Sequence, residues 1–285
     1  MDTELFDQLP LEKVTNYHAI GGGDINQAFE LEDQSKTRYL LLLQPHHSKK
    51  FFQHEVTGLK LMAQTVLTPK VLAYGDFKDD AYLLLSYVAH QPTGDQYKMG
   101  KELAQLHRRK SPNGCYGFEE NFTIGTYHVD NSWNVSWNNF FINQRLEDLK
   151  KLIKGRNLWT SQMEILYQKA LLVFKQLMQD HQPAPALLHG DLWAGNFLFD
   201  LNGDPVFIDP SLFYGDREFD IGITRVFGGF TKDFYQGYND EYPLEKGAEK
   251  RIPFYQLYYL MFHLSQFGVS YQGSVLSMLK LCAGI

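Results

Sequence analysis

Three polar residues in the second half of the chain have the types and spacing of a site that binds a charged phosphate group. Residues 189–196 read HGDLWAGN, which sets Asp191 and Asn196 five residues apart, and a second acid, Asp209, follows thirteen residues later. The intervening FLFDLNGDPVFID predicts two short strands around a turn at its Asn-Gly pair, which returns Asp209 to the side of Asn196. One amide and two carboxylates would then surround one hard cation such as Mg²⁺.

This set of residues predicts a phosphoryl-transfer centre. In protein kinases a loop aspartate meets the acceptor hydroxyl, while a loop asparagine and a later aspartate hold Mg²⁺. On that pattern Asp191 is the catalytic residue, which deprotonates the attacking hydroxyl from about 2.6–3.2 Å, and Asn196 and Asp209 are metal ligands. A capping or turn aspartate is the alternative for Asp191, but the HG before it and the asparagine after it favour catalysis. His189 is expected to support the loop through backbone hydrogen bonds.

The composition is that of an ordinary globular protein and argues against several classes. The chain has 285 residues, 44% of them hydrophobic, which suffices for one large domain or two lobes. The net charge of −6 comes without a basic tract, which argues against nucleic-acid binding. The two cysteines lie far apart, so neither a disulfide framework nor a zinc site is indicated. Apolar runs are too short to cross a bilayer and no signal peptide is indicated, so we expect a cytoplasmic protein with access to ATP and no membrane partner.

The elements that position these residues fall into two predicted lobes. Residues 1–88 combine strands around a glycine cluster, one helix from about residue 48 and a hairpin that turns at residues 78–80. Residues 89–285 are mostly helical, interrupted by the catalytic hairpin. We therefore expect an α+β, bilobal protein-kinase-like fold with a small antiparallel-sheet N-terminal lobe, a larger mainly helical C-terminal lobe and a hinge at about residues 86–92.

The first lobe supplies the predicted nucleotide-binding residues. A glycine triplet at positions 21–23 lets the backbone approach phosphates closely, although a triplet between strands also suits an ordinary turn. Its place ahead of two strands favours nucleotide binding, and the hinge would hold adenine through backbone groups. The residues expected to bind ATP are Gly22, Gly23, Asp24, Asn26, Glu55, Ser86, Tyr87 and Val88.

In its motifs the chain resembles the fructosamine (ketosamine) kinases, relatives of the aminoglycoside and choline kinases. The resemblance covers nearly the whole chain and is carried by HGDLWAGN, by IDPSLFYGDREFDIGITRVFGGF after it, and by GGDINQ, FQHEVTGL and WNNFFINQRL. It implies transfer of the ATP γ-phosphate to a sugar hydroxyl of a ketosamine, the 3-hydroxyl in that family. Because the product then releases its amine, this is a deglycation or repair reaction. The acceptor is a small ketosamine or a glycated protein side chain.

One residue departs from the family pattern. The strand RYLLLLQ carries Leu42 where the family has a lysine. In kinases that lysine pairs with a helix glutamate, here Glu55, and binds the phosphates. Lys49 and Lys50 precede the helix, but two solvated loop lysines are favoured over a substitute for the missing cation. An otherwise intact site would bind nucleotide weakly, turn over slowly or recruit a cation from elsewhere.

Two further residues are assigned to the substrate. Trp193 lies where the acceptor is expected, and it either stacks on a sugar face or belongs to the core. Asp216, in the segment YGDRE, contacts substrate or, as the favoured alternative, joins Arg217 and Glu218 in an internal charge network. Two rival functions stay open: a kinase of another small amino alcohol or of an aminoglycoside, and a weakly active or silent nucleotide-binding relative.

Overall fold

The computed structural model describes residues 2–21, 26–125 and 127–285, which form two compact units. The first unit comprises the chain up to Asp95 together with Leu198–Pro210, and the second comprises Gln96–Phe197 together with Ser211–Ile285. The expected boundary after residue 88 differs from this division, because the catalytic hairpin and the segment up to Asp95 both belong to the first unit. The reason is strand pairing, since β6 (His90–Gln91) is hydrogen-bonded to β10 (Phe197–Asp200).

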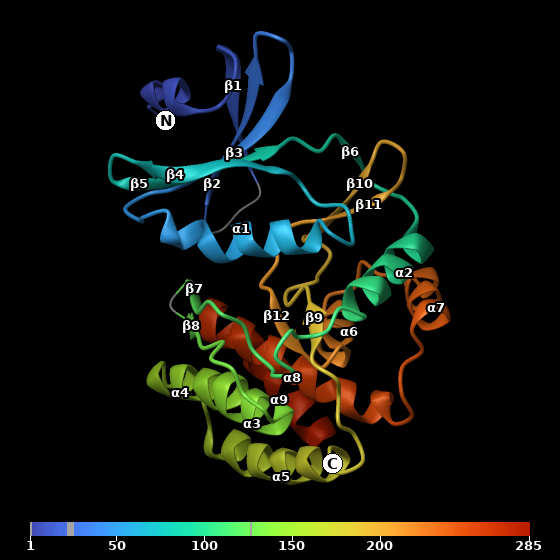
Figure 1. Ribbon diagram of the computed structural model, residues 1–285. Helices are drawn as coiled ribbons and strands as arrows, with labels where there is room; N and C mark the ends of the chain where they lie inside the picture. Colours follow the sequence, from blue (N-terminus) through green and yellow to red (C-terminus); the bar gives the residue numbers. More distant parts are fainter. Residues whose placement is uncertain (1, 22–25, 126) are drawn as a thin grey trace. The chain divides into compact units, whose positions relative to one another are not determined.

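The first unit is built on a five-stranded antiparallel sheet, as expected (Figure 1). Leu42 on the central strand lies opposite Ala28 on one neighbour and Leu83 on the other. Lys78, whose φ is 53°, makes the turn of the predicted hairpin between β4 and β5. The sheet order is β1-β2-β3-β5-β4, and the strands are β1 (Val14–Ile20), β2 (Gln27–Asp33), β3 (Arg38–Gln44), β4 (Val71–Phe77) and β5 (Asp80–Ser86), preceded by a short 3-10 helix, η1 (Thr3–Gln8).

The two faces of this sheet carry separate apolar clusters, because successive strand residues point to opposite sides. Leu41 and Leu43 of β3 belong to the cluster on the η1 side. Leu40 and Leu42 pack instead against the cluster beneath α1 (Lys50–Met62). That helix, predicted from its spacing of apolar residues, buries Phe52, Val56, Leu59 and Met62.

The predicted catalytic hairpin is present. Strands β10 and β11 (Pro205–Phe207) are joined by a turn in which Gly203 has a φ of 84° and donates its N–H to the Asp200 carbonyl at 2.9 Å. The N–H of Phe207 donates to the carbonyl of Leu67, also at 2.9 Å, which ties the hairpin to the segment after α1. Asp209 follows directly after this attachment.

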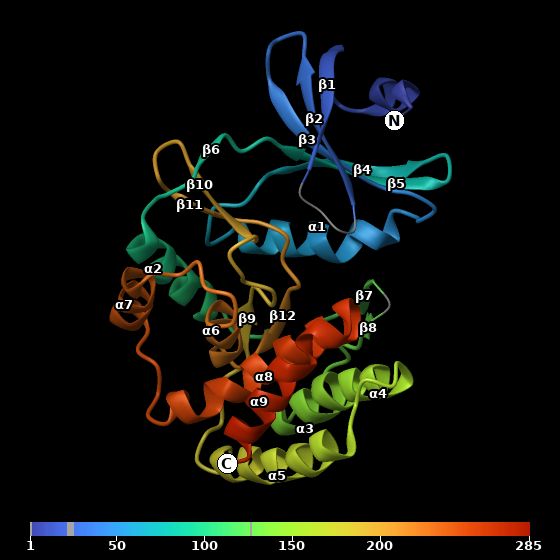
Figure 2. The same ribbon diagram turned by 180° about the vertical axis from the view of Figure 1, so that it is seen from behind.

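The second unit is mainly helical, as expected (Figure 2). In both views α9 runs beside α8, and α7 lies against α2. Two small antiparallel pairs, β7 with β8 and β9 with β12, complete the unit. Its helices are α2 (Gln96–His107), α3 (Trp137–Phe141), the π-helix η2 (Ile142–Leu146), α4 (Glu147–Gly155), α5 (Ser161–Leu177), α6 (Glu218–Thr224), α7 (Lys232–Glu241), α8 (Ala248–Phe267), the 3-10 helix η3 (Val269–Tyr271) and α9 (Gln272–Cys282), and its strands are β7 (Phe122–Ile124), β8 (Tyr127–Val129), β9 (Ala186–Leu188) and β12 (Phe213–Gly215).

Aromatic side chains form much of the core of the second unit. Trp137 stacks on Phe140 and Phe141 with ring centroids 5.6 Å apart in each pair, and its indole N–H donates to the hydroxyl of Tyr255 at 2.9 Å. Large rings bury much apolar surface in defined orientations, so they fix how α3 meets α8. Among the described helices, none is long and apolar enough to span a bilayer.

Candidate active site

The catalytic loop, residues 189–196, follows β9 and begins with a turn that requires glycine. Gly190 has a φ of +82°, and a Cβ added there would lie 2.0 Å from the carbonyl oxygen of Ser211. Because that oxygen is backbone and L side chains are strained at this φ, a larger residue would displace the chain. The N–H of Ser211 donates to the carbonyl of His189 at 2.9 Å, so the two segments are joined here.

A buried carboxylate holds the start of this loop. Asp220 of α6 has no exposed surface and accepts from two consecutive backbone N–H groups, those of His189 at 2.7 Å and Gly190 at 2.9 Å. His107 of α2 lies 3.0 Å from the same carboxylate through Nε2, and its Nδ1 lies 2.8 Å from the Tyr238 hydroxyl. Burial lowers the pKa of His107, although Asp220 opposes the shift. A neutral His107 therefore donates to Asp220 and accepts from Tyr238.

Asp191 is oriented by two side chains. The hydroxyl of Tyr259 on α8 donates to Asp191 Oδ1 at 2.8 Å, and Asn196 Nδ2 donates to Asp191 Oδ2 at 3.0 Å and to its carbonyl at 2.8 Å. Burial and the negative charge of Asp191 raise the pKa of Tyr259 well above its usual value, so the phenol remains a donor. The two hydrogen bonds hold the Asp191 carboxylate in one orientation.

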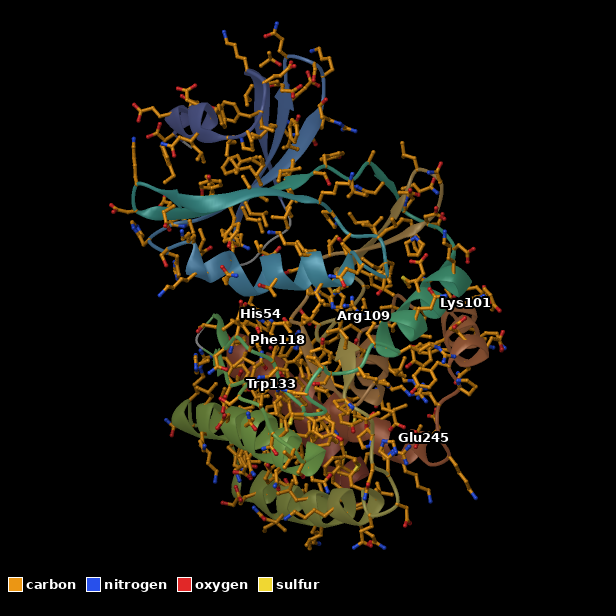
Figure 3. The ribbon with its side chains drawn as sticks, viewed as in Figure 1. His54, Lys101, Arg109, Phe118, Trp133 and Glu245 are labelled. Carbon is orange, nitrogen blue, oxygen red and sulfur yellow. The ribbon has the colours of Figure 1, made fainter. Side chains whose placement is uncertain are left out.

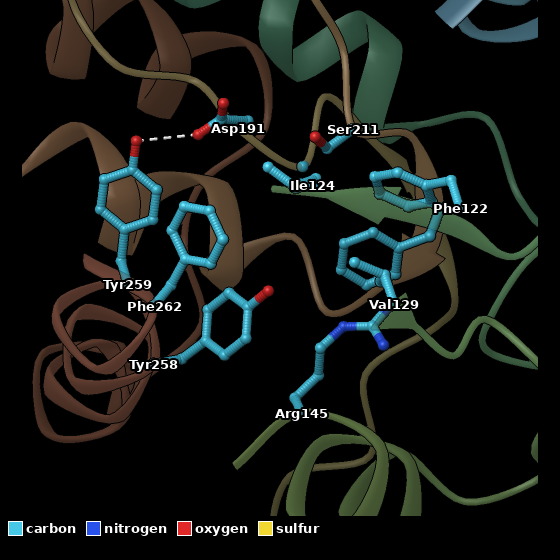
Figure 4. A pocket seen from close by; sticks show the side chains of 11 residues that line it. Phe122, Ile124, Val129, Arg145, Asp191, Ser211, Tyr258, Tyr259 and Phe262 are labelled. Carbon is cyan, nitrogen blue, oxygen red and sulfur yellow. Dashed lines mark hydrogen bonds between the residues drawn. The ribbon is translucent and has the colours of Figure 1, made fainter. Parts of the chain in front are cut away.

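A narrow pocket lies beside Asp191, entirely within the second unit (Figure 4). Its lining side chains leave about 380 Å³ of space when open solvent is included, and the enclosed part is small. Figure 4 shows Asp191 and Ser211 at one end and Arg145 at the other, with Tyr258, Tyr259 and Phe262 of α8 along one side. The remaining lining residues are Phe122, Ile124, Val129, Gly190 and Phe213. A carboxylate base above an aromatic-walled pocket can receive a compact polar molecule and abstract a proton from one of its hydroxyls.

The first unit contains the other predicted acids. Asp209 has a φ of 51°, the left-handed region that is costly for a residue other than glycine and occurs often at functional sites. Glu55 on α1 is half-buried. Loss of hydration, together with the negative charge of Asp209, raises the pKa of Glu55 well above its usual value. The two carboxyl groups therefore repel each other when both are ionised.

Leu42 occupies the strand position at which a lysine was expected. Its side chain packs on the α1 side of the sheet, against the cluster that contains Phe52 and Val56. It therefore extends the apolar core beneath the helix that carries Glu55. The two lysines weighed as substitutes, Lys49 and Lys50, are both exposed, and Lys50 is the first residue of α1.

Of the other predicted nucleotide residues, Gly22, Gly23 and Asp24 lie outside the described part of the chain. Asn26 is half-buried just before β2. At the predicted hinge, Ser86 pairs with Lys70, since its N–H donates to the Lys70 carbonyl at 2.9 Å and its hydroxyl oxygen accepts from the Lys70 N–H at 2.8 Å. The ring of Tyr87 lies 4.1 Å from the guanidinium carbon of Arg38, and the carbonyl of Val88 contacts a ring nitrogen of His90 at 3.1 Å.

Comparison with known proteins gives the family. The family model described as fructosamine kinase matches residues 3–283. The chain belongs to the fructosamine kinase family. A probable ketoamine kinase of Lactiplantibacillus plantarum is 43% identical over 271 residues, 94% of each chain, and a chloroplastic protein-ribulosamine 3-kinase of rice is 31% identical over 94% of this chain and 78% of its own length. A crystal structure described as a putative fructosamine-3-kinase of Thermobifida fusca superposes with a TM-score of 0.88 at 25% identity, covering 99% of this chain and 98% of that one. The expected protein-kinase-like fold is confirmed by these neighbours.

Trp193, expected beside the acceptor in a fructosamine kinase, is 39% exposed. It does not line the pocket next to Asp191. Its ring covers Gly195 so closely that a Cβ there would lie 2.3 Å from it. The side chain is thus a partly exposed cover on the catalytic loop rather than a core residue, and stacking on a sugar stays a prediction.

Asp216 lies in the core. It has no exposed surface and contacts His181 Nε2 at 2.9 Å, the Tyr255 hydroxyl at 2.7 Å and the Glu218 N–H at 3.0 Å. Burial opposes ionisation of Asp216, but the hydrogen bonds from His181 and Tyr255 outweigh it and hold its pKa below the usual value. These contacts fit the internal charge network, and we do not assign Asp216 to the substrate.

The same network includes the one group of possible metal ligands found among the described residues, namely His181, Asp216 and Glu218. Arg251 donates to Glu218 twice, at 2.8 and 2.6 Å, and His181 Nδ1 lies 3.0 Å from Glu245, which Figure 3 labels. Because these partners already occupy the donors and acceptors, the group is an ion-pair network and not a vacant metal site.

Sequence reasoning missed four residues of the site. His107 lies at the end of a short amphipathic segment, where a solvated position is usual, but it is fully buried and supports Asp220. Tyr259 has the helical spacing of a core residue, but its hydroxyl holds Asp191. No sequence pattern assigned a role to Asp220 or Arg145. The one available signal for a buried aspartate was the acidic pair Glu218 and Asp220 in the first turn of α6.

Proposed function

We propose that this protein transfers the γ-phosphate of ATP to a sugar hydroxyl of a ketosamine, the 3-hydroxyl as in the named ribulosamine 3-kinase relative. The observation that carries this proposal is the Asp191 carboxylate, held by Tyr259 and Asn196 at the end of a narrow pocket. Membership in the fructosamine kinase family supplies the substrate class. A cytoplasmic location, where ATP is available, belongs to the same proposal.

In this mechanism Asp191 receives the proton of the acceptor hydroxyl. The acceptor oxygen forms a bond to the γ-phosphorus as the bond from that phosphorus to the β,γ-bridging oxygen breaks, which yields a phosphate monoester and ADP. Tyr259 and Asn196 keep the carboxylate aimed during the transfer. Because such reactions depend mainly on positioning and charge neutralisation, the fixed orientation of Asp191 is its chief contribution.

Asn196 and Asp209 would hold Mg²⁺. One offers an amide oxygen and the other a carboxylate, which are the ligand types that Mg²⁺ takes in proteins, so the donor set fits the ion. When bound, Mg²⁺ would neutralise negative charge on the β- and γ-phosphates. The amide of Asn196 is already oriented, because its Nδ2 donates twice to Asp191.

The first unit would bind the nucleotide. The segment that includes Gly22, Gly23 and Asn26 would cover the phosphates, and the backbone of residues 86–88 would hold adenine. The pocket is compact, and we propose a small ketosamine as the acceptor, with a glycated protein side chain as the alternative.

A second candidate is a slow or silent nucleotide-binding relative. It is favoured by one observation, the apolar packing of Leu42 where the strand lysine was expected. Under this alternative the protein binds ATP in a thermal-shift assay but transfers no phosphate to any acceptor.

An acceptor screen tests both candidates. Purified protein, Mg²⁺ and γ-labelled ATP are incubated with ribulosamines and fructosamines, and in parallel with choline, homoserine and an aminoglycoside. Label transfer to the ketosamines alone supports the proposed function. Transfer to the other alcohols alone overturns the ketosamine assignment, and ATP binding without any transfer supports the silent relative. Asp191→Asn, assayed in parallel, identifies any transfer that does not depend on this site.

A further inference from the structure

Arg145 is a buried cation at the end of the pocket opposite Asp191 (Figure 4). Its side chain lies in the π-helix η2 and is 1% exposed. The guanidinium carbon lies 4.4 Å from the ring centroid of Phe140 and 4.8 Å from that of Phe213, so two aromatic rings face it. A guanidinium between two rings is held in one orientation, with its N–H groups directed along its edge.

The hydrogen bonds of Arg145 all go to neutral oxygens. Nη1 donates to the carbonyls of Asp130 at 2.7 Å and Gln144 at 3.0 Å, and Nη2 donates to the side-chain oxygen of Asn131. The Asp130 carboxylate instead accepts from the N–H of Ser132 at 2.9 Å. These three bonds use three of the five N–H groups of a guanidinium.

Within residues 2–21, 26–125 and 127–285, Arg145 forms no ion pair with a carboxylate. The other buried arginine of the unit behaves differently, since Arg251 forms a two-point ion pair with Glu218. Burial opposes ionisation of Asp130, but the hydrogen bonds from Ser132 and the charge of Arg145 lower its pKa, so Arg145 interacts with this carboxylate through space without pairing with it. A buried cation that lacks a paired carboxylate can be stabilised further by an anion from a molecule in the pocket.

Tyr258 lines the pocket and is affected by the charges at both of its ends. Burial raises the pKa of its phenol to about 12, Arg145 works against that rise and Asp191 adds to it. The hydroxyl thus lies within electrostatic reach of both charges. One pocket presents a negative base at one end and a positive guanidinium at the other.

We propose that Arg145 binds a carboxylate carried by the amine part of the acceptor, so that the preferred substrate is a ketosamine of a free amino acid. This proposal rests on the proposed function, because the sugar hydroxyl is taken to lie at Asp191. The carboxylate then lies at the far end of the pocket, with the aromatic wall of α8 beside the carbon chain between them. An uncharged amine part, such as a peptide-linked residue, provides no anion to pair with Arg145.

The alternative role for Arg145 is purely structural, since it joins η2 to the segment after β8 through two oxygens, those of Asp130 and Asn131. A structural clamp affects every acceptor equally. A carboxylate site affects only those acceptors that carry the negative charge. Substrate discrimination therefore separates the two roles, whereas total activity does not.

The test compares matched pairs of synthetic ribulosamines. Each pair shares one sugar and one ω-amino acid, and one member has a free carboxylate where the other has a carboxamide. Spacers from glycine to 4-aminobutyrate vary the distance between amine and carboxylate. With the wild-type protein we expect kcat/KM to favour the acid over the amide by about 10- to 100-fold at the best spacer, mainly through KM, as a charge-assisted hydrogen bond provides.

Variants then assign the preference to Arg145. Arg145→Met should bring the kcat/KM ratio of acid to amide to about one. Arg145→Lys should retain part of the preference for the acid because the charge is kept. Arg251→Met is the matched control, since it also removes a buried arginine but lies outside the pocket, and it should leave the ratio unchanged. Circular dichroism of each variant shows whether it has folded.

The outcomes separate this inference from the proposed function. Equal kcat/KM for acid and amide at every spacer, with clear turnover of both, overturns the carboxylate site and leaves the kinase assignment standing. A preference that persists in a folded Arg145→Met variant also overturns it. Absence of phosphate transfer to every ribulosamine counts against the proposed function itself. If Arg145→Met fails to fold, the wild-type comparison of acid with amide still decides.

Discussion

Two carboxyl groups of the molecule have opposite surroundings. One is Asp191 in the second unit, and the other is Glu55 in the first. Asp191 has its neighbours arranged to support its charge, since Tyr259 and Asn196 both donate to it. Burial, together with the negative charge of a second acid, Asp209, raises the pKa of Glu55. In one region the chain's own side chains support a carboxylate, and in the other two acids disfavour each other's ionisation.

The difference follows from one strand position. Leu42 adds to the apolar cluster beneath α1, whereas a lysine there would place its ammonium near the Glu55 helix. Within the proposed function this separates two tasks. Substitutions near Asp191 should act mainly on the chemical step, and substitutions near Glu55 should act mainly on nucleotide affinity and on stability.

The largest effect is expected for Asp191→Asn. The amide cannot accept the proton of the acceptor hydroxyl, and general-base contributions are about 10²- to 10⁴-fold, so kcat should fall by about that factor. The KM for ATP should change by less than about threefold, because the residue is assigned to the acceptor side. Steady-state kinetics with a ribulosamine measure both values. Wild-type turnover by this variant would remove Asp191 from its assigned role.

A smaller loss is expected for Tyr259→Phe, which deletes one hydrogen bond to the Asp191 carboxylate. A bond to a charged group contributes about 1.5–3 kcal/mol, so kcat/KM should fall by about 10- to 100-fold. Tyr258→Phe is the matched control, because it removes a hydroxyl from the same wall of the pocket without removing a bond to Asp191. Equal losses in the two variants would assign the effect to the pocket wall and not to the orientation of Asp191.

In the first unit, Leu42→Lys should improve nucleotide binding, whereas the two preceding substitutions reduce activity. The new ammonium can pair with Glu55 and approach the phosphates, so the KM for ATP should fall by about tenfold, the effect of about 1.4 kcal/mol. Leu42→Met, which keeps the apolar packing, is the control and should leave the KM unchanged. An unchanged or higher KM in a folded Leu42→Lys variant would show that the nucleotide affinity does not depend on this position.

The smallest effect concerns stability and pH. The pKa of Glu55 is raised in the folded state, so its contribution to stability is full below its unfolded pKa of about 4.3 and is lost as pH rises through the folded pKa. Glu55→Gln removes this loss, so its Tm should rise relative to wild type between about pH 4 and pH 8, by the equivalent of about 1 kcal/mol or less because the group is half-buried. Thermal unfolding across that range measures the difference. A constant difference between the two proteins across this range would contradict the assigned titration.

The parts that the sequence predicted well depend on local patterns. The spacing of Asp191 and Asn196 predicted a loop that brings the two side chains together, which their hydrogen bond shows, and the period of apolar residues identified α1 and the hairpins. The parts that it missed depend on which side of an element faces which neighbour. Tyr259 has the helical spacing of a core residue, and only the packed unit shows that its hydroxyl meets Asp191.

Buried polar groups were the other source of error. His107 is the last residue of an amphipathic helix and would be solvated if the helix end were free, but α2 packs against α7 and His107 is buried. Arg145 lies in a segment rich in aromatic residues. The hydrogen-bond partners of the His107 and Arg145 side chains are mostly distant in sequence, so the local spacing of residues does not predict them.

The anchoring of the loop by Asp220 has a consequence for how different acceptors compare. The carboxylate receives two adjacent amide protons from residues about thirty positions earlier in the chain. The loop conformation is therefore set when the second unit folds, before any small molecule arrives. Differences in rate among acceptors should then reflect how well each molecule fits a rigid receptor, and the backbone amides of His189 and Gly190 should exchange with deuterium as slowly in the free protein as in a complex.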